Sequence, residues 1–582
     1  MVPSPAVMTE SPQHKISPEQ IQQVVDDPMS LDLLDDAQRL VPALPTQSFV
    51  HIAKMLRNEG RLDLIVPHAT ADQLTGIFDL DTWTQGRIDV ARARTWLALI
   101  VESLATSERP RGDLVRTMYA MDPEMWTFAS LAATAVAQLD PEDDALRQQI
   151  LEDMSALITW ESPDGLFVVG VPDHEMGRSS LAILAAVYDD SLDDGRRLLN
   201  SLKWAIASEI EEQLLLWRKG RLADMGFPEW EDAMRLFAPI SRAAIIGDKA
   251  PEEVALATED EPLPPEIWDR GGGWLRQVMA ALTPVEHGRR TREFLLLINE
   301  LIAAQRLEPG DAASQEKALE QAQATLNLSF EMLLSGSKHT DPVSFLAERV
   351  AAAGLRRLFR HGYGALAGLR KASQKLHSDG AISIDHVGSL LDRPWGPAVR
   401  HLSLWMPEIA LGSKKNSGRP IRDMSDVARA TALVAGAAAL VRLCFDKKGY
   451  GIDAVWLTRC DEPERICLGD LVRTAVIRTE LPADPSRGDL AFPLTPADLI
   501  LARKTMLVGG ALRPDLRANF VERCIAVGGP EGAEVLSSNL LTRLEVELGG
   551  MEFNENLPDL NQIGGMLTIQ QVGVWLKIRS GN

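Results

Sequence analysis

Residues 208–239 constrain the fold more than any other stretch, because they combine a helix start, a break and a second helix start. The stretch reads SEIEEQLLLWRKGRLADMGFPEWEDAMRLFAP. Ser208 and Glu211 form the pattern of a capping box, in which a hydroxyl and a carboxylate each accept a backbone N–H at a helix start. Gly220 allows that helix to end, and Gly226 can adopt the positive φ of a tight turn. We therefore predict two helices joined at a corner.

Apolar residues recur at helical spacing on both sides of this corner, which predicts one buried face on each helix. The predicted faces comprise Ile210, Leu214 and Trp217 on the first helix, and Trp230, Met234 and Phe237 on the second. Between the faces lies a charged set, which comprises Glu211, Glu212, Arg218, Arg221 and Asp224. Its members can pair as salt bridges at i,i+4-like spacings and across the turn.

Two hypotheses account for this charged set. In the first, the residues form an ion-paired corner that fixes the angle between two helices, because paired charges often specify geometry without adding stability. In the second, the four residues Glu212, Arg218, Arg221 and Asp224 line a polar cleft in an enzyme of unrecognised class. The structural hypothesis is favoured, because charge networks that perturb pKa values are common in structural positions too.

The composition predicts an all-α fold. Hydrophobic residues make up 45% of the 582 residues, enough for a large core, whereas aromatic residues make up 5%. A chain with so much alanine and leucine favours helices over sheets. The length corresponds to about four domains or to one continuous, multi-helical array that resembles a helical repeat. A few short β segments are expected, at residues 165–171 (GLFVVGV) and 573–578 (GVWLKI).

Changes in composition divide the chain into five parts. These are a disordered tail at 1–17, an N-terminal helical region at 18–240 that ends in the corner, an acidic Pro/Gly-rich connector at 241–275, a central helical region at 276–480, and a C-terminal region of short helices and some strands at 481–582. The tail is rich in proline and serine, which is typical of disorder. The connector contains the acidic run TEDEPLPP, which marks a boundary between regions.

Several polar residues have a predicted structural role. Asp89 precedes an amphipathic helix as its N-cap, and Asp423 or Ser425 starts a later helix. Asn299 lies in the apolar segment REFLLLINELIAAQRL, where a buried amide must find a carbonyl of a neighbouring helix or loop.

Two more motif residues are structural or interface candidates. They are Asn327, in a long helix, and Arg360, in the basic segment LRRLFRHGYGALAGLRKA. The basic segment is interpreted as a solvated helix face.

Charge and cysteine usage disfavour several classes of protein. The net charge is -22, which disfavours binding to nucleic acid and to membrane surfaces. The apolar run at 430–441 is shorter than a membrane span and predicts a small-residue helix packed against its neighbours. The four cysteines form no CxxC motif, which fits a reducing compartment. With no signal-peptide pattern at the N-terminus, we expect a cytoplasmic protein.

No catalytic, metal or cofactor motif is present. The chain lacks GxSxG, HExxH, GK[ST] and GxGxxG sequences. The segment FDLDTW, with Asp79 and Asp81, lacks the remaining ligands of an EF-hand and is interpreted as an acidic turn before a buried tryptophan. The glycines at 271–273 could cradle a ligand but lack the rest of a phosphate-binding loop. We therefore assign no catalytic residue, metal or cofactor.

The segment 217–239 resembles the central signature of a bacterial family, domain of unknown function 6178. Further similar segments are ATADQLTGIFDLDTW, LINELIAAQ, LNLSFEMLLSG, LFRHGYGAL and RPIRDMSDVARA, which together run from about residue 68 to residue 440. The resemblance implies an all-helical cytoplasmic protein and supplies no catalytic residue.

The sequence thus favours a cytoplasmic helical scaffold or regulatory protein whose partner is another protein. The alternatives are the enzyme with the polar cleft and a ligand-sensing protein that uses the triple-glycine loop.

Overall fold

The computed structural model describes most of the chain. The described residues are 20, 23–24, 27–34, 37–84, 86–107, 121, 124–125, 134–173, 175–204, 207–247, 273–336, 339–378, 390–411, 418–453, 466–482, 490–551, 553–554, 557–558 and 564–571. The predicted tail and the predicted strand at 573–578 lie outside them, as do Cys460 and glycines 271 and 272.

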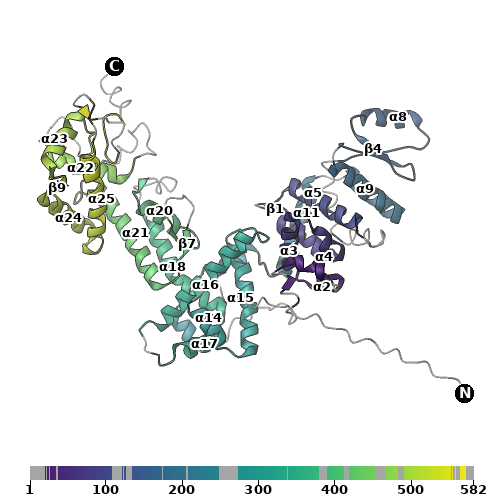
Figure 1. The fold of residues 1–582 in the computed structure, drawn as a ribbon, viewed down its shortest axis with the longest axis horizontal. Coiled ribbons are helices and arrows are strands. Elements are labelled where there is room, and N and C mark those ends of the chain that lie inside the picture. Colours follow the sequence, from purple (N-terminus) through teal and green to yellow (C-terminus); the bar gives the residue numbers. More distant parts are fainter. Residues whose placement is uncertain are drawn as a thin grey trace.

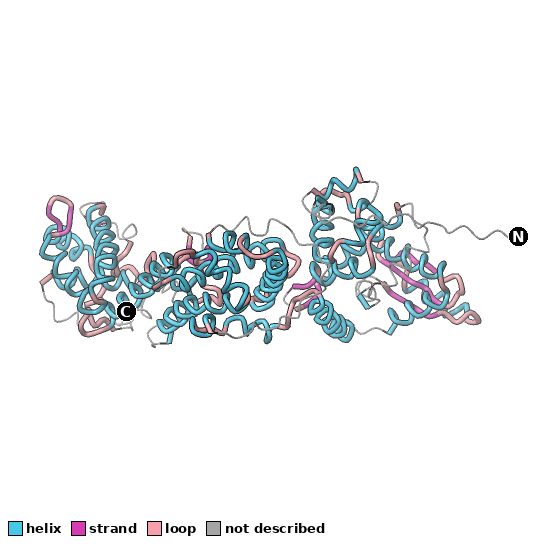
Figure 2. Tube along the Cα trace, turned by 90° about the horizontal axis from the view of Figure 1, so that it is seen from below, coloured by secondary structure: helices cyan, strands magenta, loops and turns pink. Residues whose placement is uncertain are grey.

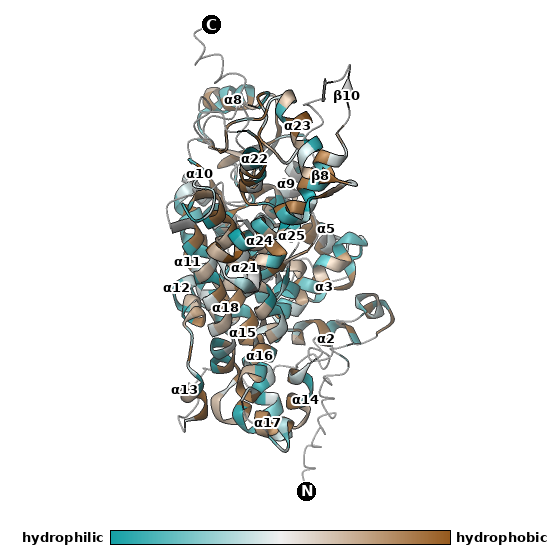
Figure 3. Ribbon diagram, turned by 90° about the vertical axis from the view of Figure 1, so that its left-hand side faces the viewer, coloured by the Kyte–Doolittle hydropathy of each residue, from teal (hydrophilic) through white to brown (hydrophobic). Residues whose placement is uncertain are grey.

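Helices dominate the described residues, and the few strands are short (Figure 2). The prediction of a mainly α fold is therefore confirmed. The molecule is elongated and bent: the N-terminal helices and a small sheet lie at one end, the C-terminal helices lie at the other, and the central helices lie between them (Figure 1). In Figure 3, hydrophobic and hydrophilic residues alternate along the helices, as expected where each helix buries one face.

The N-terminal helices enclose the start of the largest core. They are η1 (Pro28–Leu33), α2 (Ala37–Ala43), α3 (Thr46–Asn58), η2 (Leu62–Leu64), η3 (Val66–His68), α4 (Ala71–Asp81) and α5 (Val90–Ala105), with the hairpin β1 (Trp83–Thr84) and β2 (Arg87–Ile88) between the last two. Thr70 and Gln73 form a capping box at the start of α4. Asp89 caps α5 as predicted, because its side chain accepts the N–H of Arg92.

A small antiparallel sheet lies beside these helices. It consists of β3 (Ala135–Gln138), β4 (Ile158–Glu161) and β5 (Phe167–Val171), with α8 (Asp144–Asp153), α9 (Glu175–Asp190) and α10 (Leu192–Trp204). It joins the N-terminal helices through α9, whose Val187 packs in the largest core. The predicted β segment 165–171 supplies β5, which is the central strand. Both faces of β5 are buried: Phe167 and Val169 pack toward α9 and α10, whereas Val168 packs toward Met154.

The predicted corner and connector contain four helical elements. These are α11 (Ala207–Asp224), α12 (Trp230–Ala233), η4 (Met234–Phe237) and α13 (Arg242–Ile246). Two details of the corner differ from prediction. Ser208 lies inside α11 and not ahead of it, and the helix runs through Gly220 to Asp224, because Gly226 with φ +83° provides the break. Helix α13 packs on α17 and α18, so the segment assigned to the connector begins as ordered structure.

The central helices share one hydrophobic core with the N-terminal helices. They are α14 (Trp274–Ala280), α15 (Pro284–Ala304), α16 (Ala312–Leu334), α17 (Pro342–Ala353) and α18 (Leu355–Ser378). Buried residues from Val24 to Val434 form this single cluster. Residues predicted to belong to two separate regions therefore bury their apolar surface together.

The C-terminal region has its own core. The elements from residue 395 onward are α20 (Trp395–Leu402), β6 (Glu408–Ala410), β7 (Gly418–Pro420), α21 (Met424–Phe445), α22 (Leu468–Glu480), α23 (Pro496–Met506), β8 (Leu507–Val508), β9 (Ala511–Leu512), α24 (Pro514–Gly528), α25 (Pro530–Gly549), β10 (Phe553–Asn554) and β11 (Leu557–Pro558). Ile409 of β6 packs in the first core, whereas α22 to α25 pack in the second. The region beyond residue 481 contains longer helices than predicted, because α24 and α25 pack lengthwise on each other and on α21.

Helix α21 belongs to both cores. Ala430 and Val434 pack in the first core, and Leu440 and Leu443 pack in the second. Asp423 caps the helix, which selects one of the two predicted starts. Among the described residues, α21 is the one helix with the length and composition of a membrane span, and 44% of its most apolar window is buried. The complete helix is longer than the run at 430–441 on which the prediction rested, and its small and apolar residues pack against both cores as predicted.

Candidate functional site

Two buried aspartates mark the C-terminal end of α4. The side chain of Asp79 is 1% exposed and that of Asp81 is 6% exposed. The sequence predicted an acidic turn here, but the helix continues to Asp81, and the buried Trp83 starts β1. Carboxylates at a helix C-terminus face the negative end of the helix dipole. Their burial therefore requires cations from elsewhere in the chain.

Asp79 receives its cations from α11. The Arg221 guanidinium donates two hydrogen bonds to the Asp79 carboxylate, at 2.6 and 2.9 Å. Arg218 Nε donates to the backbone carbonyl of Asp79 at 2.7 Å, and its guanidinium lies over the Trp83 ring. Burial lowers the pKa of Arg218 to about 10, with Asp79 opposing and Arg221 adding to the shift. The two arginines thus neutralise Asp79 and satisfy a carbonyl that the helix end leaves unpaired.

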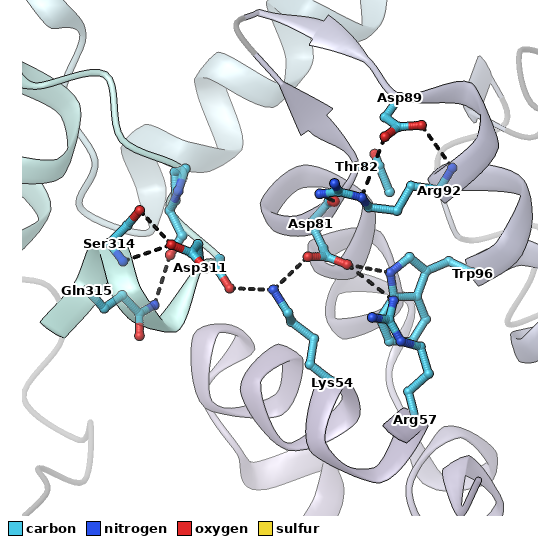
Figure 4. A network of polar contacts seen from close by, with 12 residues as sticks. Lys54, Arg57, Asp81, Thr82, Asp89, Arg92, Trp96, Asp311, Ser314 and Gln315 are labelled. Atoms are coloured by element: carbon cyan, nitrogen blue, oxygen red, sulfur yellow. Dashed lines mark hydrogen bonds and ion pairs between the residues drawn. The ribbon is translucent and has the colours of Figure 1, made fainter. Parts of the chain in front are cut away.

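Asp81 receives its cations from α3 (Figure 4). Lys54 Nζ lies 2.6 Å from one carboxylate oxygen. Trp96 Nε1 donates to the other oxygen at 2.7 Å, and the Arg57 guanidinium lies 3.5 Å from the same oxygen. Arg92 donates to the backbone carbonyl of Asp81 at 3.0 Å. Both carboxylate oxygens are therefore occupied by donors from α3 and α5.

Lys54 also connects the N-terminal helices to the central region. Its ammonium donates to the carbonyl of Gly310 at 2.7 Å, in the loop between α15 and α16 (Figure 4). A Cβ atom on Gly310 would collide with the backbone carbonyl of Leu80, so only glycine allows this close approach. Asp311 holds the loop by capping α16 through Ser314. The loop therefore fits directly against the end of α4.

The corner makes a second connection between the same regions. The carbonyl of Met225 accepts hydrogen bonds from Gln47 of α3 at 3.0 Å and from Asn299 of α15 at 3.1 Å. A Cβ atom on Gly226 would lie 2.6 Å from Leu296, so glycine permits this packing as well as the positive φ. The prediction that Asn299 binds a helix or loop carbonyl is confirmed. We refer to Asp79, Asp81, their cations, Gly310 and the Met225–Gly226 turn as the joint.

The other predicted polar residues also bind backbone groups. Glu211 accepts the N–H of Ile88 in β2 at 3.1 Å. Asn327 accepts the N–H of Leu275 at 2.9 Å and so caps the start of α14. Arg360 donates to the carbonyl of Ala238 at 2.9 Å, which attaches η4 to α18. These three residues position neighbouring elements.

The four residues of the predicted polar cleft do not converge on one point within the described residues. Glu212 and Asp224 are exposed and make no ion pair within the described residues, whereas Arg218 and Arg221 bind Asp79. The charges on α11 were expected to pair with one another. Arg221 binds the Asp79 carboxylate instead, because a buried carboxylate is unscreened and attracts a guanidinium more strongly than the solvated carboxylates of α11 do.

The predicted apolar faces of the corner are only partly buried. Ile210, Leu214 and Phe237 are buried as expected. Trp217 is 41% exposed and Trp230 is 36% exposed, which contradicts the prediction for both. Arg306 stacks on Trp230, whose indole N–H donates to the carbonyl of Ala304. Met234, which was also predicted to face inward, lies in η4 and is half-buried.

The chemistry available at the joint is limited because every carboxylate oxygen is engaged. Within the described residues no group of three or more histidine, cysteine, aspartate or glutamate side chains could hold a metal ion. A Ser329–His361 pair lies in the central core at 2.9 Å, but both side chains are sealed from solvent. Burial raises the pKa of Cys467 and of Cys524 to about 12, which keeps these thiols protonated.

The sequence did not reveal the roles of Lys54, Arg57 and Gly310. Lys54 and Arg57 lie three residues apart on α3. This spacing places them on the same helix face but does not identify the residue that they bind. Gly310 lies 256 residues from Lys54 in the chain. Pairing over that distance depends on the tertiary fold.

Fold and site together define a predominantly helical protein whose regions are fastened by a buried polar joint. The chain belongs to a family of unknown function, DUF6178, whose model matches residues 32–568. This confirms the resemblance inferred from the sequence. Three motifs that carried it, around Asp79, Arg221 and Asn299, meet at the joint. No curated protein and no solved structure matches the chain.

Proposed function

We propose that this protein is a cytoplasmic helical scaffold of a bacterial cell and that it binds another protein through α11. The observation that carries the proposal is the apolar outer face of this helix. Leu216 is 66% exposed and Trp217 is 41% exposed, and Trp204, just before α11, is 73% exposed. Tryptophan is enriched among the residues that dominate the energy of protein interfaces.

The anchoring of α11 supports this role. Its inner face packs Leu214 into the core, and Arg218 and Arg221 fasten it to α4. An apolar surface on a rigid helix loses little conformational entropy when it binds, so its burial contributes more to affinity. The enzyme hypothesis has less support, because Arg218 and Arg221 bind Asp79 and do not converge with Glu212 and Asp224.

The net charge of -22 bears on the choice of partner. It repels phosphate backbones and anionic lipid headgroups, which supports a protein partner over nucleic acid or a membrane. The proposed surface itself is uncharged at its centre, so shape and apolar area would determine the binding there.

The test is affinity purification from native cells followed by quantitative mass spectrometry. The wild type is compared with the double variant Leu216→Ser/Trp217→Ser. Val285→Ser is the matched control, because Val285 is 81% exposed on α15 and loses a similar apolar side chain.

We expect the double variant to retain its circular dichroism and melting temperature while at least one co-purifying protein falls tenfold or more. The control should retain that protein. Retention of all co-purifying proteins by a folded double variant would contradict the proposal.

A further inference from the structure

A second surface lies far along the chain from α11, between α18 and α21. The two helices enclose an open groove with a cavity volume of about 550 Å³. Small residues line both walls: Gly364, Gly368 and Ala372 on α18, and Thr431, Ala435 and Ala438 on α21. Leu369 and Val434 form a buried apolar floor.

The walls of the groove leave room for another helix. Gly368, Ala372 and Ala435 are exposed. A Cβ atom built on Gly368 meets no atom within 4 Å, so that glycine faces open space. The small residues recur at four-residue intervals on α18, which produces a shallow channel along the helix. Helices pack in such channels at interaxial distances of 8–10 Å.

The charge of the groove differs from that of the chain. The residues that line the groove include two cations, one on each helix, and no aspartate or glutamate. Helix α21 contains two arginines and one aspartate, and that aspartate is paired with Arg419 at the start of the helix. Lys375 and Arg442 lie along the groove itself. A positive groove on a protein with a net charge of -22 is complementary to an acidic ligand.

The shape of the groove decides between acidic ligands. Proteins bind single-stranded nucleic acid largely by stacking its bases on aromatic side chains. No aromatic residue lines this groove. A bilayer surface is broad, whereas this cavity is a channel between two helices. An amphipathic helix with small apolar residues on one face and carboxylates at its edges matches both the channel and its charge.

We propose that the groove between α18 and α21 binds an acidic amphipathic helix of a partner protein. This inference adds a second binding surface, with a defined partner chemistry, to the proposed scaffold function. Because the groove and the outer face of α11 share no residue, variants in one test it separately from the other.

The test places a photo-crosslinking amino acid at Ala435 of the full-length protein in native cells. The same amino acid at Val285, on α15, is the control for non-specific capture. Crosslinked peptides are mapped by mass spectrometry, and the mapped segment is then synthesised and titrated against the purified protein by fluorescence anisotropy.

Two variants probe the groove. Gly368→Leu fills it with a side chain that meets open space, and leucine has a higher helix propensity than glycine, so the fold is retained. Lys375→Glu reverses a charge along the groove. We expect Gly368→Leu to weaken binding of the peptide at least tenfold, Lys375→Glu to weaken it severalfold, and added salt to weaken binding to the wild type.

The inference is supported if the mapped segment is helical and acidic and if both variants lose it while Leu216→Ser/Trp217→Ser retains it. It is overturned if Ala435 crosslinks to lipid, to nucleic acid, to a second copy of this chain or to nothing beyond the Val285 control. It is also overturned if the crosslinked peptide is basic, or if folded Gly368→Leu binds it as the wild type does. Loss of the segment from the α11 variant alone would place the contact on α11.

Discussion

Two clusters of buried carboxylates differ in how many cations surround them: carboxylates outnumber cations in one cluster, and cations outnumber carboxylates in the other. In the C-terminal core, Asp392 and Asp470 share the single guanidinium of Arg473, and all three side chains are less than 10% exposed. At the joint, Asp79 and Asp81 are equally buried but face the cations of α3 and α11, which are about one quarter to one third exposed.

The difference in charge balance reflects a difference in role. Asp470 and Arg473 are three residues apart on α22, and Asp392 joins them from the segment before α20, so the cluster secures the interior of one core. The joint takes its cations from helices far apart in the chain and fixes those helices relative to one another. Partial exposure of its cations lowers the desolvation penalty, whereas the C-terminal cluster bears that penalty in full.

The largest expected effect is the removal of Arg473. In Arg473→Met the two buried carboxylates have no cation, and we expect the opening free energy of α22 to fall by about 3–5 kcal/mol. Native-state hydrogen exchange of α22 measures it. Arg517→Met is the matched control, since Arg517 pairs with Glu545 at the surface of the same region, and we expect less than about 1 kcal/mol there. Equal effects in both variants would remove the distinction between a sealed and an exposed pair.

The corresponding change at the joint is Arg221→Ala. It leaves the Asp79 carboxylate without its two donors, but water can enter through the partly exposed site and Arg218 remains close. We expect a loss of about 1.5–3 kcal/mol, the range for a hydrogen bond to a charged group. Hydrogen exchange of α4 and α11 reports it. The control is Arg235→Ala, which removes a surface pair of α12 and η4 and should change stability by no more than about 0.5 kcal/mol.

A third test separates packing from charge at the joint. Gly310→Ala introduces a methyl group against the carbonyl of Leu80, and the loop must shift, which costs about 1–3 kcal/mol. Gly220→Ala is the matched control, because its Cβ meets nothing within 4 Å on α11 and should stabilise the helix by up to about 1 kcal/mol. Thermal unfolding and exchange of the α16 N-terminus measure both. If Gly310→Ala were also stabilising, the close approach would not be a constraint.

The smallest expected effect is a difference in pH dependence between the two cores. Burial and the charge of Arg242 lower the pKa of His361 below 6.5, so the unfolded chain binds the proton more tightly and the central core loses stability as pH falls below about 6.5. Burial and Asp392 raise the pKa of Asp470 above 3.8, against the opposing charge of Arg473. The folded state then binds the proton more tightly than the unfolded chain does. The stability that this protonation gives to the folded protein is lost as pH rises through the folded-state pKa of Asp470.

Hydrogen exchange at pH 5.5 and 7.5, corrected for intrinsic rates, tests this contrast. On acidification we expect α16 and α18 to become less protected, with a smaller change in His361→Gln. Helix α22 is also followed at about pH 4, close to the 3.8 of a free aspartate, where it should become relatively more protected than at pH 7.5. The change should be smaller in Asp470→Asn, which keeps an acceptor for the N–H of Cys467. Parallel changes in the two cores, unaffected by either variant, would contradict the assignment.

Local signals in the sequence predicted local structure well. The caps Asp89 and Asp423, the β5 strand and the need of Asn299 for a carbonyl were all evident, because each depends on residues within a few positions or on burial alone. Trp217 was placed in the core because helical spacing indicates periodicity without specifying which apolar side faces inward. Helix α11 is apolar on two sides, and only packing decided between them.

The sequence by itself determined the helical class, several helix starts, the family and some of the residues that form the joint, among them Arg218, Arg221 and Asn299. The tertiary structure decided which of those residues meet. The spacing on α11 predicts that Arg218 and Arg221 can pair within the charged set of the corner, yet they bind Asp79, which is 139 and 142 residues away. A solvated carboxylate attracts a guanidinium weakly, whereas a buried one must be neutralised. Burial at the end of α4 is a property of the folded chain, and it fixed the corner's partners.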